Sequence, residues 1–379
     1  LPMPEGTPVA LNELTALGVG AAAGRVFDAE TPDELVAALR EVWATGDPWF
    51  VLGGGSNLFV GDEPFEGSVV RVRTQGIERL PAAQGRARLR VQAGHNWDDL
   101  VAYAVAEGLA GIEAMSGIPG TVGAAPVQNV GAYGQEIVGT LVEVELVDER
   151  SGEVSTVSAA ELGLGFRTSV LKHHYGSVPE RPAVILSVTL ELLDVGHGEQ
   201  PVPGAQLRQA LGLAPEQPVS LQWIRDRVLA IRASKGMVLD DADPDTYSAG
   251  SFFQNVIVSA AFARTLPDAC PKWPVHPDID SVTVIPLEEY TGALPFASGA
   301  ASDVKISAGW LIEHSGLRKG FRFPRSRAGL STKHALALTN RGNANAEELA
   351  ELARFIQHRV QSEFGVNLQP EPVLVGVEL

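Results

Sequence analysis

Residues 51–60, VLGGGSNLFV, constrain the fold most strongly because three consecutive glycines and a Ser-Asn pair stand between two apolar runs. Glycine at a strand exit costs conformational entropy, so such a run is tolerated mainly where φ must be positive or another group approaches the backbone closely. Successive N–H groups in a tight turn bind anions, and Ser56 and Asn57 can add side-chain donors. The segment predicts a phosphate-binding loop, with a hairpin turn as the alternative. It lacks the Gly-Lys-Ser/Thr of a P-loop and the G-x-G-x-x-G of a dinucleotide-binding helix.

A second segment, MSGIPGTVGAAPVQNVGAYGQEI (residues 115–137), is also rich in small residues. Such residues cannot fill a core by themselves, so we expect this chain to lie against a large flat ligand and to supply backbone donors to it. Gln128 and Asn129 would add directional contacts. A glycine-rich surface loop is the alternative, but Val122, Val130 and similar residues make the segment too apolar for free solvent.

The length and the net charge of the chain limit the functions that it can have. A chain of 379 residues exceeds one typical core, so two or three domains are expected. Acidic residues outnumber basic ones by 46 to 29, and a net charge of -17 disfavours non-specific binding to nucleic acids or acidic membranes.

The single cysteine, Cys270, excludes a disulfide framework and a cysteine-based zinc site. The histidines show no metal-ligand spacing, so we expect no metal. No secretory signal and no apolar span of about 20 residues is visible, which predicts a cytoplasmic protein.

Alternating helix and strand patterns predict an α+β protein. Thr31 and Glu34 form a capping box ahead of a helix that leads into the strand before the first glycine segment. Asn96, Ser220 and Asn345, the last with Glu348, are the predicted N-caps of three later helices. The Gly- and Pro-rich run at 193–205 supports no regular element and separates two domains. The expected division is 1–72 and 73–200 as two parts of one binding region, 217–344 as a further domain, and 345–379 rejoining the first part.

Four more motifs follow in order: GFRTSVLK, YSAGSFFQN, KISAGWLIEHSG and NLQPEPVLVG. With the two glycine-rich segments they resemble the UDP-N-acetylenolpyruvoylglucosamine reductase family, flavoenzymes of bacterial cell-wall precursor synthesis, over nearly the whole chain. The resemblance implies a three-domain flavoprotein with a two-part FAD-binding domain of the PCMH/vanillyl-alcohol-oxidase type and a separate substrate-binding domain. It implies non-covalent FAD, NADPH as cosubstrate and a small nucleotide-sugar substrate. We expect a monomer that binds neither nucleic acid nor membrane.

The resemblance also assigns the cofactor site. FAD would lie against both glycine-rich segments and the end of a later helix, with its pyrophosphate in the first. The implied residues are Gly53, Gly54, Gly55, Ser56, Asn57, Ser116, Gly117, Gly120, Gly123, Gln128, Asn129, Gly131 and Arg232.

Three residues match the family's catalytic groups. Arg167 in GFRTSVLK matches its arginine, and a forked, permanently charged guanidinium suits a carboxylate and the enolate beside it. Ser251 in YSAGSFFQN matches the proton donor. Glu371, between two prolines that fix φ, matches a second acidic group. The alternatives are a surface ion pair for Arg167, a structural turn for Ser251 and an exposed carboxylate for Glu371.

Substrate contacts are implied for Lys235, Tyr133 and Asn255. Lys235 ends a helix, where a cation favours the helix dipole in any case, and by resemblance it would meet the diphosphate. The chain departs from some family members at Pro203, where those members carry a flap tyrosine.

Two other functions stay open on the sequence. The first is another enzyme of the same FAD-binding superfamily, such as a hydroxy-acid or sugar-lactone oxidase. Such enzymes often attach flavin through His or Cys near the glycine loop, and residues 1–60 contain neither. The second is a flavin- or nucleotide-binding regulator without catalysis, which the joint presence of Arg167, Ser251 and Glu371 disfavours.

Overall fold

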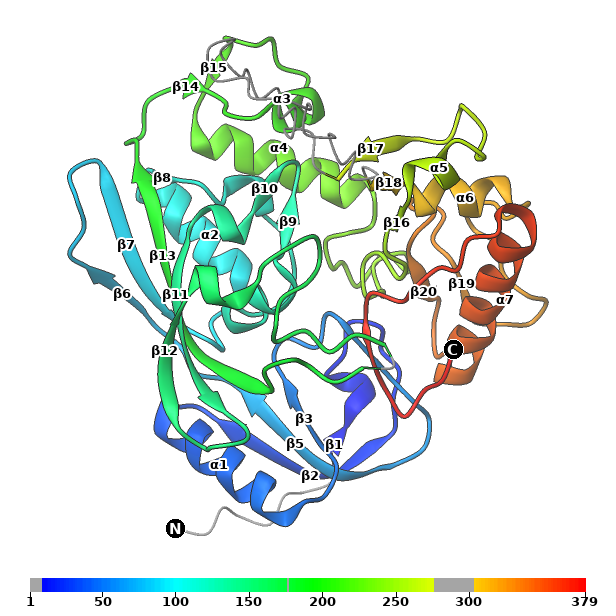
Figure 1. Cartoon of the computed structure of the whole chain (residues 1–379), viewed down its shortest axis with the longest axis horizontal. Helices are drawn as coiled ribbons and strands as arrows, with labels where there is room; N and C mark the ends of the chain where they lie inside the picture. Colours follow the sequence, from blue (N-terminus) through cyan, green and yellow to red (C-terminus); the bar gives the residue numbers. More distant parts are fainter. Residues whose placement is uncertain (1–8, 176, 276–302) are drawn as a thin grey trace, which may run out of the picture.

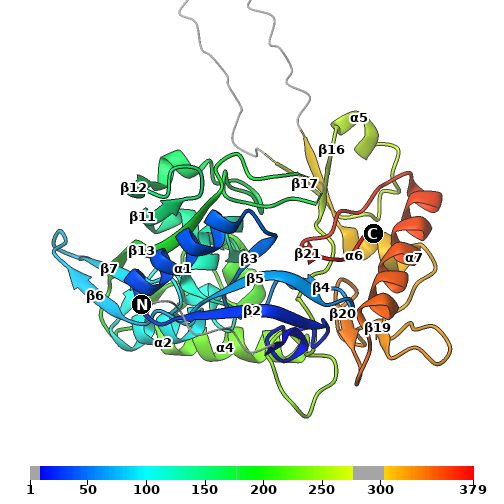
Figure 2. The same ribbon diagram turned by 90° about the horizontal axis from the view of Figure 1, so that it is seen from below.

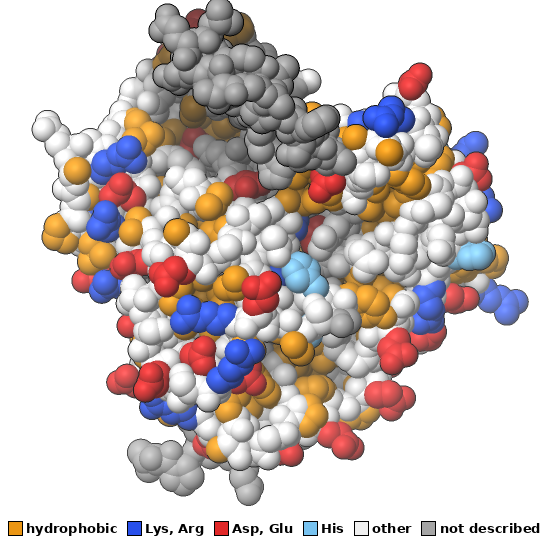
Figure 3. Space-filling view, viewed as in Figure 1, with side chains coloured by type: hydrophobic (Ala, Val, Ile, Leu, Met, Phe, Trp, Pro, Cys, Tyr) orange, Lys and Arg blue, Asp and Glu red, His pale blue; other side chains and the backbone are white. Residues whose placement is uncertain are grey.

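The computed structural model describes residues 9–175, 177–275 and 303–379 (Figure 1). The segment SVTVIP (residues 281–286) of the expected third domain lies outside the described residues. In the described ranges, no helix is both long enough and apolar enough to cross a membrane. On the face shown in Figure 3, acidic and basic side chains are interspersed among apolar ones.

The first part of the chain forms a four-stranded sheet in the order β1-β2-β5-β3. β5 pairs in parallel with both β2 and β3, and α1 connects β2 to β3. The Thr31–Glu34 capping box is present at the start of α1, whose apolar face is buried. The elements are β1 (Val9–Ala10), β2 (Ala22–Ala29), α1 (Pro32–Thr45), β3 (Trp49–Leu52) and β5 (Phe65–Val72).

The second part is an antiparallel sheet in the order β12-β11-β13-β7-β6, with β8 pairing to β13. Helix α2 begins at its predicted N-cap, Asn96. Residues of α1 and β5 share one hydrophobic core with this sheet and α2, so the two parts form one body. The elements are β6 (Ile77–Leu80), β7 (Arg86–Gln92), α2 (Trp97–Ala106), β8 (Leu109–Ala110), β11 (Leu141–Asp148), β12 (Val154–Ser158) and β13 (Ala183–Asp194).

Helices α3 (Ala205–Leu211) and α4 (Leu221–Ser234) pack on this same core through residues such as Ile224 and Val228. Arg225 of α4 also forms a two-pronged ion pair with Asp98 of α2, at 2.6 and 2.8 Å. We therefore propose a domain boundary after α4, not at residue 217. The run at 193–205 is not wholly irregular, because β14 (Gln200–Pro201) pairs with β15 (Pro218–Val219).

The remaining part has a second hydrophobic core, which includes Phe252, Phe253 and the inner face of α7. A small sheet in the order β16-β18-β17 and the hairpin β19-β20 pack with α6 and α7. Figures 1 and 2 place α7 on the opposite side of the molecule from β6 and β7. The elements are β16 (Val256–Val258), α5 (Ala260–Ala263), β17 (Lys272–Pro274), β18 (Val304–Ile306), α6 (Ala308–His314), β19 (Ala328–Leu330), β20 (Leu338–Asn340) and α7 (Ala346–Phe364).

The end of the chain returns to the first glycine segment. Strand β21 (Val373–Val375) pairs in parallel with β4 (Leu58–Val60), which directly follows that segment. Asp62 caps the start of α7, accepting from the N–H groups of Ala346 and Glu347 at 2.8 and 2.9 Å. These contacts bring residues 371–375 beside the loop at 53–57.

Candidate active site

The two glycine-rich segments lie directly against each other. A Cβ on Gly54 would lie 2.8 Å from Cα of Gly120, and one on Gly53 would lie 2.6 Å from Oγ1 of Thr121. Ser56 adds a hydrogen bond of 3.2 Å from its Oγ to the carbonyl of Pro119. The glycines are therefore required first by the contact between the two segments, because side chains would force them apart.

Gly55 has a different reason to be glycine. Its φ is +63°, a value that L side chains rarely adopt, and a Cβ there would overlap the carbonyl oxygen of Leu14. The chain before β2 thus closes over one side of the loop, and the N–H of Ala16 donates to the Gly55 carbonyl at 3.0 Å.

Between these segments and β13 lies a cavity of about 230 Å³, here named the glycine-lined cavity. Its wall combines exposed backbone with apolar side chains such as Val127 and Ile185, and Lys172 adds a positive charge. Apolar walls and exposed backbone groups fit a flat aromatic cofactor with a diphosphate. The predicted cofactor residues that line it are Gly53, Gly54, Gly55, Ser56, Asn57, Gly120, Gly123 and Gln128.

A second cavity of about 390 Å³, here named the polar cavity, shares Gly54, Ser56, Asn57 and Gln128 with the first. The structure brings all three predicted catalytic residues to its wall. The lining includes Arg167, Ser251 and Glu371, together with Gly131 and Arg232.

Arg167 is held from three directions. Its Nη1 and Nη2 donate to the carbonyls of Asn129 and Gly131 at 3.4 and 3.0 Å, and its Nε lies 3.4 Å from Oε1 of Glu371. Its own φ is +54°, a strained conformation for a residue with a side chain. The surroundings therefore fix the direction of the guanidinium, which leaves it partly open to the polar cavity.

Asn129 supports Arg167 and does not line either cavity. The residue is buried with φ at +45°, and its Nδ2 donates to Glu136 Oε2 at 2.8 Å and to the Gly165 carbonyl at 3.0 Å. Its Oδ1 accepts from the N–H of Val138 at 3.2 Å. Because these bonds engage its side chain, Asn129 contributes to the candidate site through its backbone carbonyl, which accepts a hydrogen bond from Arg167.

Glu371 is a largely buried carboxyl group, with a side chain 14% exposed, whose proton affinity is perturbed. Burial raises its pKa above the usual range, while the positive charges of Arg167 and Lys172 oppose that rise. A carboxyl group with a raised pKa is a better proton donor near neutral pH.

Backbone hydrogen bonds bring Ser251 next to Glu371. The N–H of Glu371 donates to the Phe252 carbonyl at 2.9 Å, and the N–H of Phe252 donates to the Leu336 carbonyl at 2.8 Å. Phe252 and Phe253 are fully buried, so the chain on one side of Ser251 is held in the second core.

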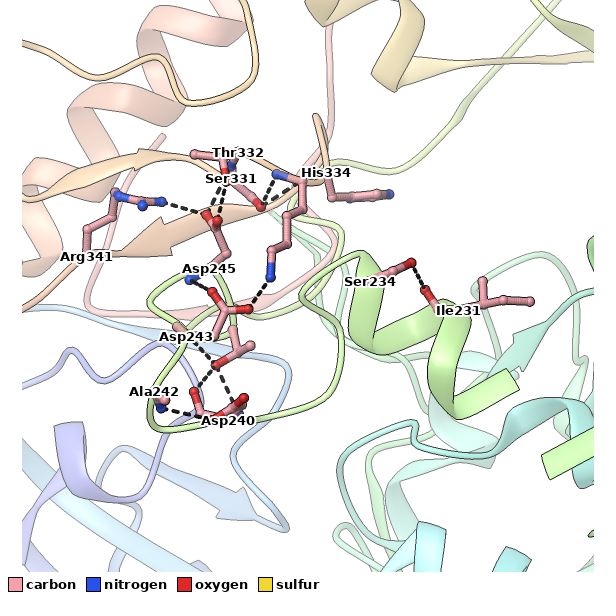
Figure 4. A network of polar contacts seen from close by, with 12 residues as sticks. Ile231, Ser234, Asp240, Ala242, Asp243, Asp245, Ser331, Thr332, His334 and Arg341 are labelled. Atoms are coloured by element: carbon pink, nitrogen blue, oxygen red, sulfur yellow. Dashed lines mark hydrogen bonds and ion pairs between the residues drawn. The ribbon is translucent and has the colours of Figure 1, made fainter. Parts of the chain in front are cut away.

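The loop leading to Ser251, residues 236–250, is anchored by the polar network drawn in Figure 4. Asp245 is buried and accepts from the N–H of Thr332 at 3.0 Å and from Arg341 Nη1 at 2.6 Å. These donors keep the pKa of Asp245 below its usual value in spite of burial. Asp243 in the same loop forms an ion pair with Lys333.

The predicted substrate residues Tyr133 and Lys235 lie together. The Lys235 ammonium is 5.9 Å from the centre of the Tyr133 ring, and Tyr133 has a strained φ of +52°. Nearby, burial lowers the pKa of His334 to about 4, helped by the positive charges of Lys235, Lys319 and Arg232. Three positive charges therefore act on His334 beside these two residues.

Like Tyr133 and Lys235, three further predicted residues are not on the lining of either cavity. Ser116 donates its hydroxyl to the Glu113 carbonyl at 2.7 Å, and Gly117 gives its N–H to Asp98 at 2.6 Å. Asn255 accepts from the N–H of Ala308 at 3.0 Å, at the start of α6. Direct ligand contacts by these residues stay predictions.

Sequence reasoning missed Lys172. It is 3% exposed, lines the glycine-lined cavity and contacts Gln128 and Glu371. The available signal was a lysine within the apolar half of GFRTSVLK, five residues after Arg167, where a solvated lysine would not be expected.

The fold and the glycine-lined cavity define an FAD-binding protein. A family model described as an FAD binding domain matches residues 23–158, which include both glycine-rich segments. A second family model, described as the C-terminal domain of UDP-N-acetylenolpyruvoylglucosamine reductase, matches residues 243–375, which carry Ser251 and Glu371.

Full-length relatives define the family. A UDP-N-acetylenolpyruvoylglucosamine reductase of Leifsonia xyli is 52% identical, over 98% of this chain and 99% of its own. That of Saccharopolyspora erythraea is 46% identical, over 98% and 95%. The crystal structure of the Thermus caldophilus reductase is similar with a TM-score of 0.59 at 27% identity, covering 97% of this chain and 98% of its own. The chain belongs to the UDP-N-acetylenolpyruvoylglucosamine reductase family, which confirms the predicted α+β flavoprotein class.

Proposed function

We propose that the protein reduces the enolpyruvyl ether of UDP-N-acetylglucosamine to UDP-N-acetylmuramate with NADPH, in peptidoglycan precursor synthesis. Family membership supports the reaction. The observation that carries the assignment of residues is that Arg167, Ser251 and Glu371 line one cavity that adjoins the glycine-lined cavity. Bound FAD supplies the means to carry a hydride from NADPH to the substrate.

Arg167 binds the substrate carboxylate. Two backbone carbonyls and Glu371 orient its guanidinium before the substrate enters, so little reorganisation is needed. When hydride reaches the terminal carbon of the enolpyruvyl group, negative charge develops on the adjacent carbon and its carboxylate. The guanidinium stabilises that charge as it forms.

Ser251 completes the reduction by donating a proton to the carbon beside the carboxylate. Glu371 acts as the second acidic group, and burial favours its protonated form. The added hydride and proton saturate the double bond, and the product retains its carboxylate. The two buried phenylalanines that follow Ser251 limit access of water from that side.

Lys235 and Tyr133 bind the nucleotide end of the substrate. The cation attracts the diphosphate, and the phenol adds a hydrogen-bond donor beside it. We also propose that the enzyme is a cytoplasmic monomer. Light scattering on the eluting peak of a size-exclusion column tests the oligomeric state.

NADPH oxidation tests the function directly. The purified protein should oxidise one NADPH for each enolpyruvyl nucleotide consumed, and it should do so only when the nucleotide is present. The matched control is the Arg167→Lys variant, which keeps the positive charge but loses the forked guanidinium that binds the carboxylate. Absence of nucleotide-dependent oxidation, or rapid reoxidation by oxygen with a hydroxy acid as donor, would favour a different flavoenzyme.

A further inference from the structure

Lys172 places a buried ammonium group at the boundary of the two cavities. Its side chain lines the glycine-lined cavity, and Glu371, whose carbonyl it binds, lines the polar cavity. Its Nζ donates to Oε1 of Gln128 at 3.0 Å and to the backbone carbonyl of Glu371 at 3.1 Å. Both of these partners are residues of the candidate site.

The same two oxygens accept hydrogen bonds from Asn57. Its Nδ2 lies 3.0 Å from Gln128 Oε1 and 3.4 Å from the Glu371 carbonyl. Lys172 and Asn57 thus share two acceptors and close a ring of four hydrogen bonds. The ring joins both glycine-rich segments, the motif of Arg167 and the C-terminal segment that carries Glu371.

The charge at this position is costly to bury. Desolvation lowers the pKa of Lys172 to about 8, and the negative charge of Glu371 opposes that shift. Lys172 is therefore mainly cationic at neutral pH. The positive charge of Arg167 also lowers the pKa of Lys172, and the charge of Lys172 in turn lowers the pKa of His174.

Filling space does not account for a lysine here. A buried ammonium is expensive, and an apolar side chain of similar length would fill the same volume at lower cost. The compensating interactions are the two hydrogen bonds and the nearby carboxyl group of Glu371. Whether the free-energy cost of burying the Lys172 ammonium is offset therefore depends on the position and charge of Glu371.

We propose that Lys172 is a positioning residue for Glu371. It fixes the main chain at 371, and with it the direction of the carboxyl group, and it holds a positive charge beside that group. The proposal rests on the proposed function, because the acidic role of Glu371 belongs to it.

The test compares Lys172→Met, which keeps length and loses charge, with Lys172→Arg, which keeps charge and donors. Stopped-flow flavin absorbance follows reduction by NADPH and reoxidation by the enolpyruvyl nucleotide separately. Lys172→Met should retain FAD and be reduced at close to the normal rate, while reoxidation slows about 10- to 100-fold, as for loss of a supporting group. Lys172→Arg should recover part of that rate.

The pH profile of reoxidation gives a readout that a purely structural role would not move. Loss of the cation favours protonated Glu371, so the limb controlled by this group should shift to higher pH by about one unit in Lys172→Met. Lys172→Arg should return it toward the original position.

A double-mutant cycle with Glu371→Gln closes the test. If Lys172 acts through Glu371, adding Lys172→Met to Glu371→Gln should slow reoxidation by less than about 3-fold, because the coupled group is already absent. Additive losses, or loss of FAD from both Lys172 variants, would overturn the proposal. If Glu371→Gln alone leaves reoxidation unchanged, the role of Glu371 in the proposed function fails. If Glu371→Gln is slow while Lys172→Met is normal, only the positioning role fails.

Discussion

The walls of the two cavities are built differently. The glycine-lined cavity is formed where one backbone segment touches another, as at Gly54 and Gly120. The polar cavity is bounded by charged side chains whose directions are set by hydrogen bonds, as for Arg167. The comparison teaches that close approach of the backbone forms the cofactor side, whereas placement of charge forms the substrate side.

The two sides should therefore fail in different ways. Added volume should damage the glycine-lined cavity, and loss of a functional group should damage the polar cavity. Hydrogen bonds among Asn57, Gln128 and Lys172 connect the two cavities. Substitutions at these residues should therefore affect both the position of the neighbouring segments and the charge around them.

The largest expected effect is that of Ser251→Ala. If Ser251 donates the proton, flavin reduction by NADPH stays nearly normal, while reoxidation by the enolpyruvyl nucleotide slows by about 10²- to 10⁴-fold, the usual loss for a positioned acid. Stopped-flow absorbance separates the two half-reactions. Ser251→Cys, which can still donate a proton, should recover part of the rate. Equal slowing of both half-reactions would mean that Ser251 shapes the cavity instead.

Gly54→Val tests the backbone contact. Its side chain would meet the Gly120 backbone and push the segments apart, which we expect to weaken FAD binding by about 3 kcal/mol, or about 100-fold. Fluorescence titration of the apoprotein with FAD measures the change. Gly139→Val is the matched control, because no atom lies within 4 Å of a Cβ there. Similar FAD affinity in both variants would contradict the contact as the reason for glycine.

His334 makes the substrate side sensitive to acid. Its folded pKa of about 4 lies below the unfolded value of 6.5, so the unfolded chain binds more protons between these values. The His334 contribution to the unfolding free energy is thus complete above pH 6.5 and falls as the pH falls toward 4. Between pH 7 and pH 5 the loss should be about 2 kcal/mol.

The matched variant for this effect is His334→Asn, compared by urea unfolding at pH 7 and pH 5. Because this variant lacks the titrating group, its unfolding free energy should fall by about 2 kcal/mol less over that interval than that of the unchanged protein. Parallel pH dependences in the two proteins would show that His334 is not the responsible group.

The smallest effect is that of Lys235→Ala. Loss of a charge-assisted contact to the diphosphate should raise KM for the nucleotide about 10-fold and change kcat less, the pattern of lost uniform binding. Steady-state kinetics with varied nucleotide measure both constants. Lys235→Arg should keep KM within a few-fold. A collapse of kcat at constant KM would place Lys235 among the reacting groups.

Local patterns predicted much of the secondary structure. The capping boxes at Thr31 and Asn345 are present, and α2 and α4 begin after their predicted N-caps, Asn96 and Ser220. Such signals join residues three positions apart, so they can be read without the fold. The sequence did not indicate that α4 packs on the first core, because an amphipathic helix does not specify which core it covers.

The sequence by itself determined the elements, the two glycine-rich segments and, through its motifs, the family and the three catalytic candidates. The tertiary structure decided that Gly54 faces Gly120, that Asn129 supports Arg167 and that Lys172 lies beside Glu371. The physical reason is separation along the chain: the Lys172 contact joins residues 199 positions apart, and that of Asn57 with Gln128 spans 71. No local periodicity encodes such pairs, because they form only when separate segments pack against one another.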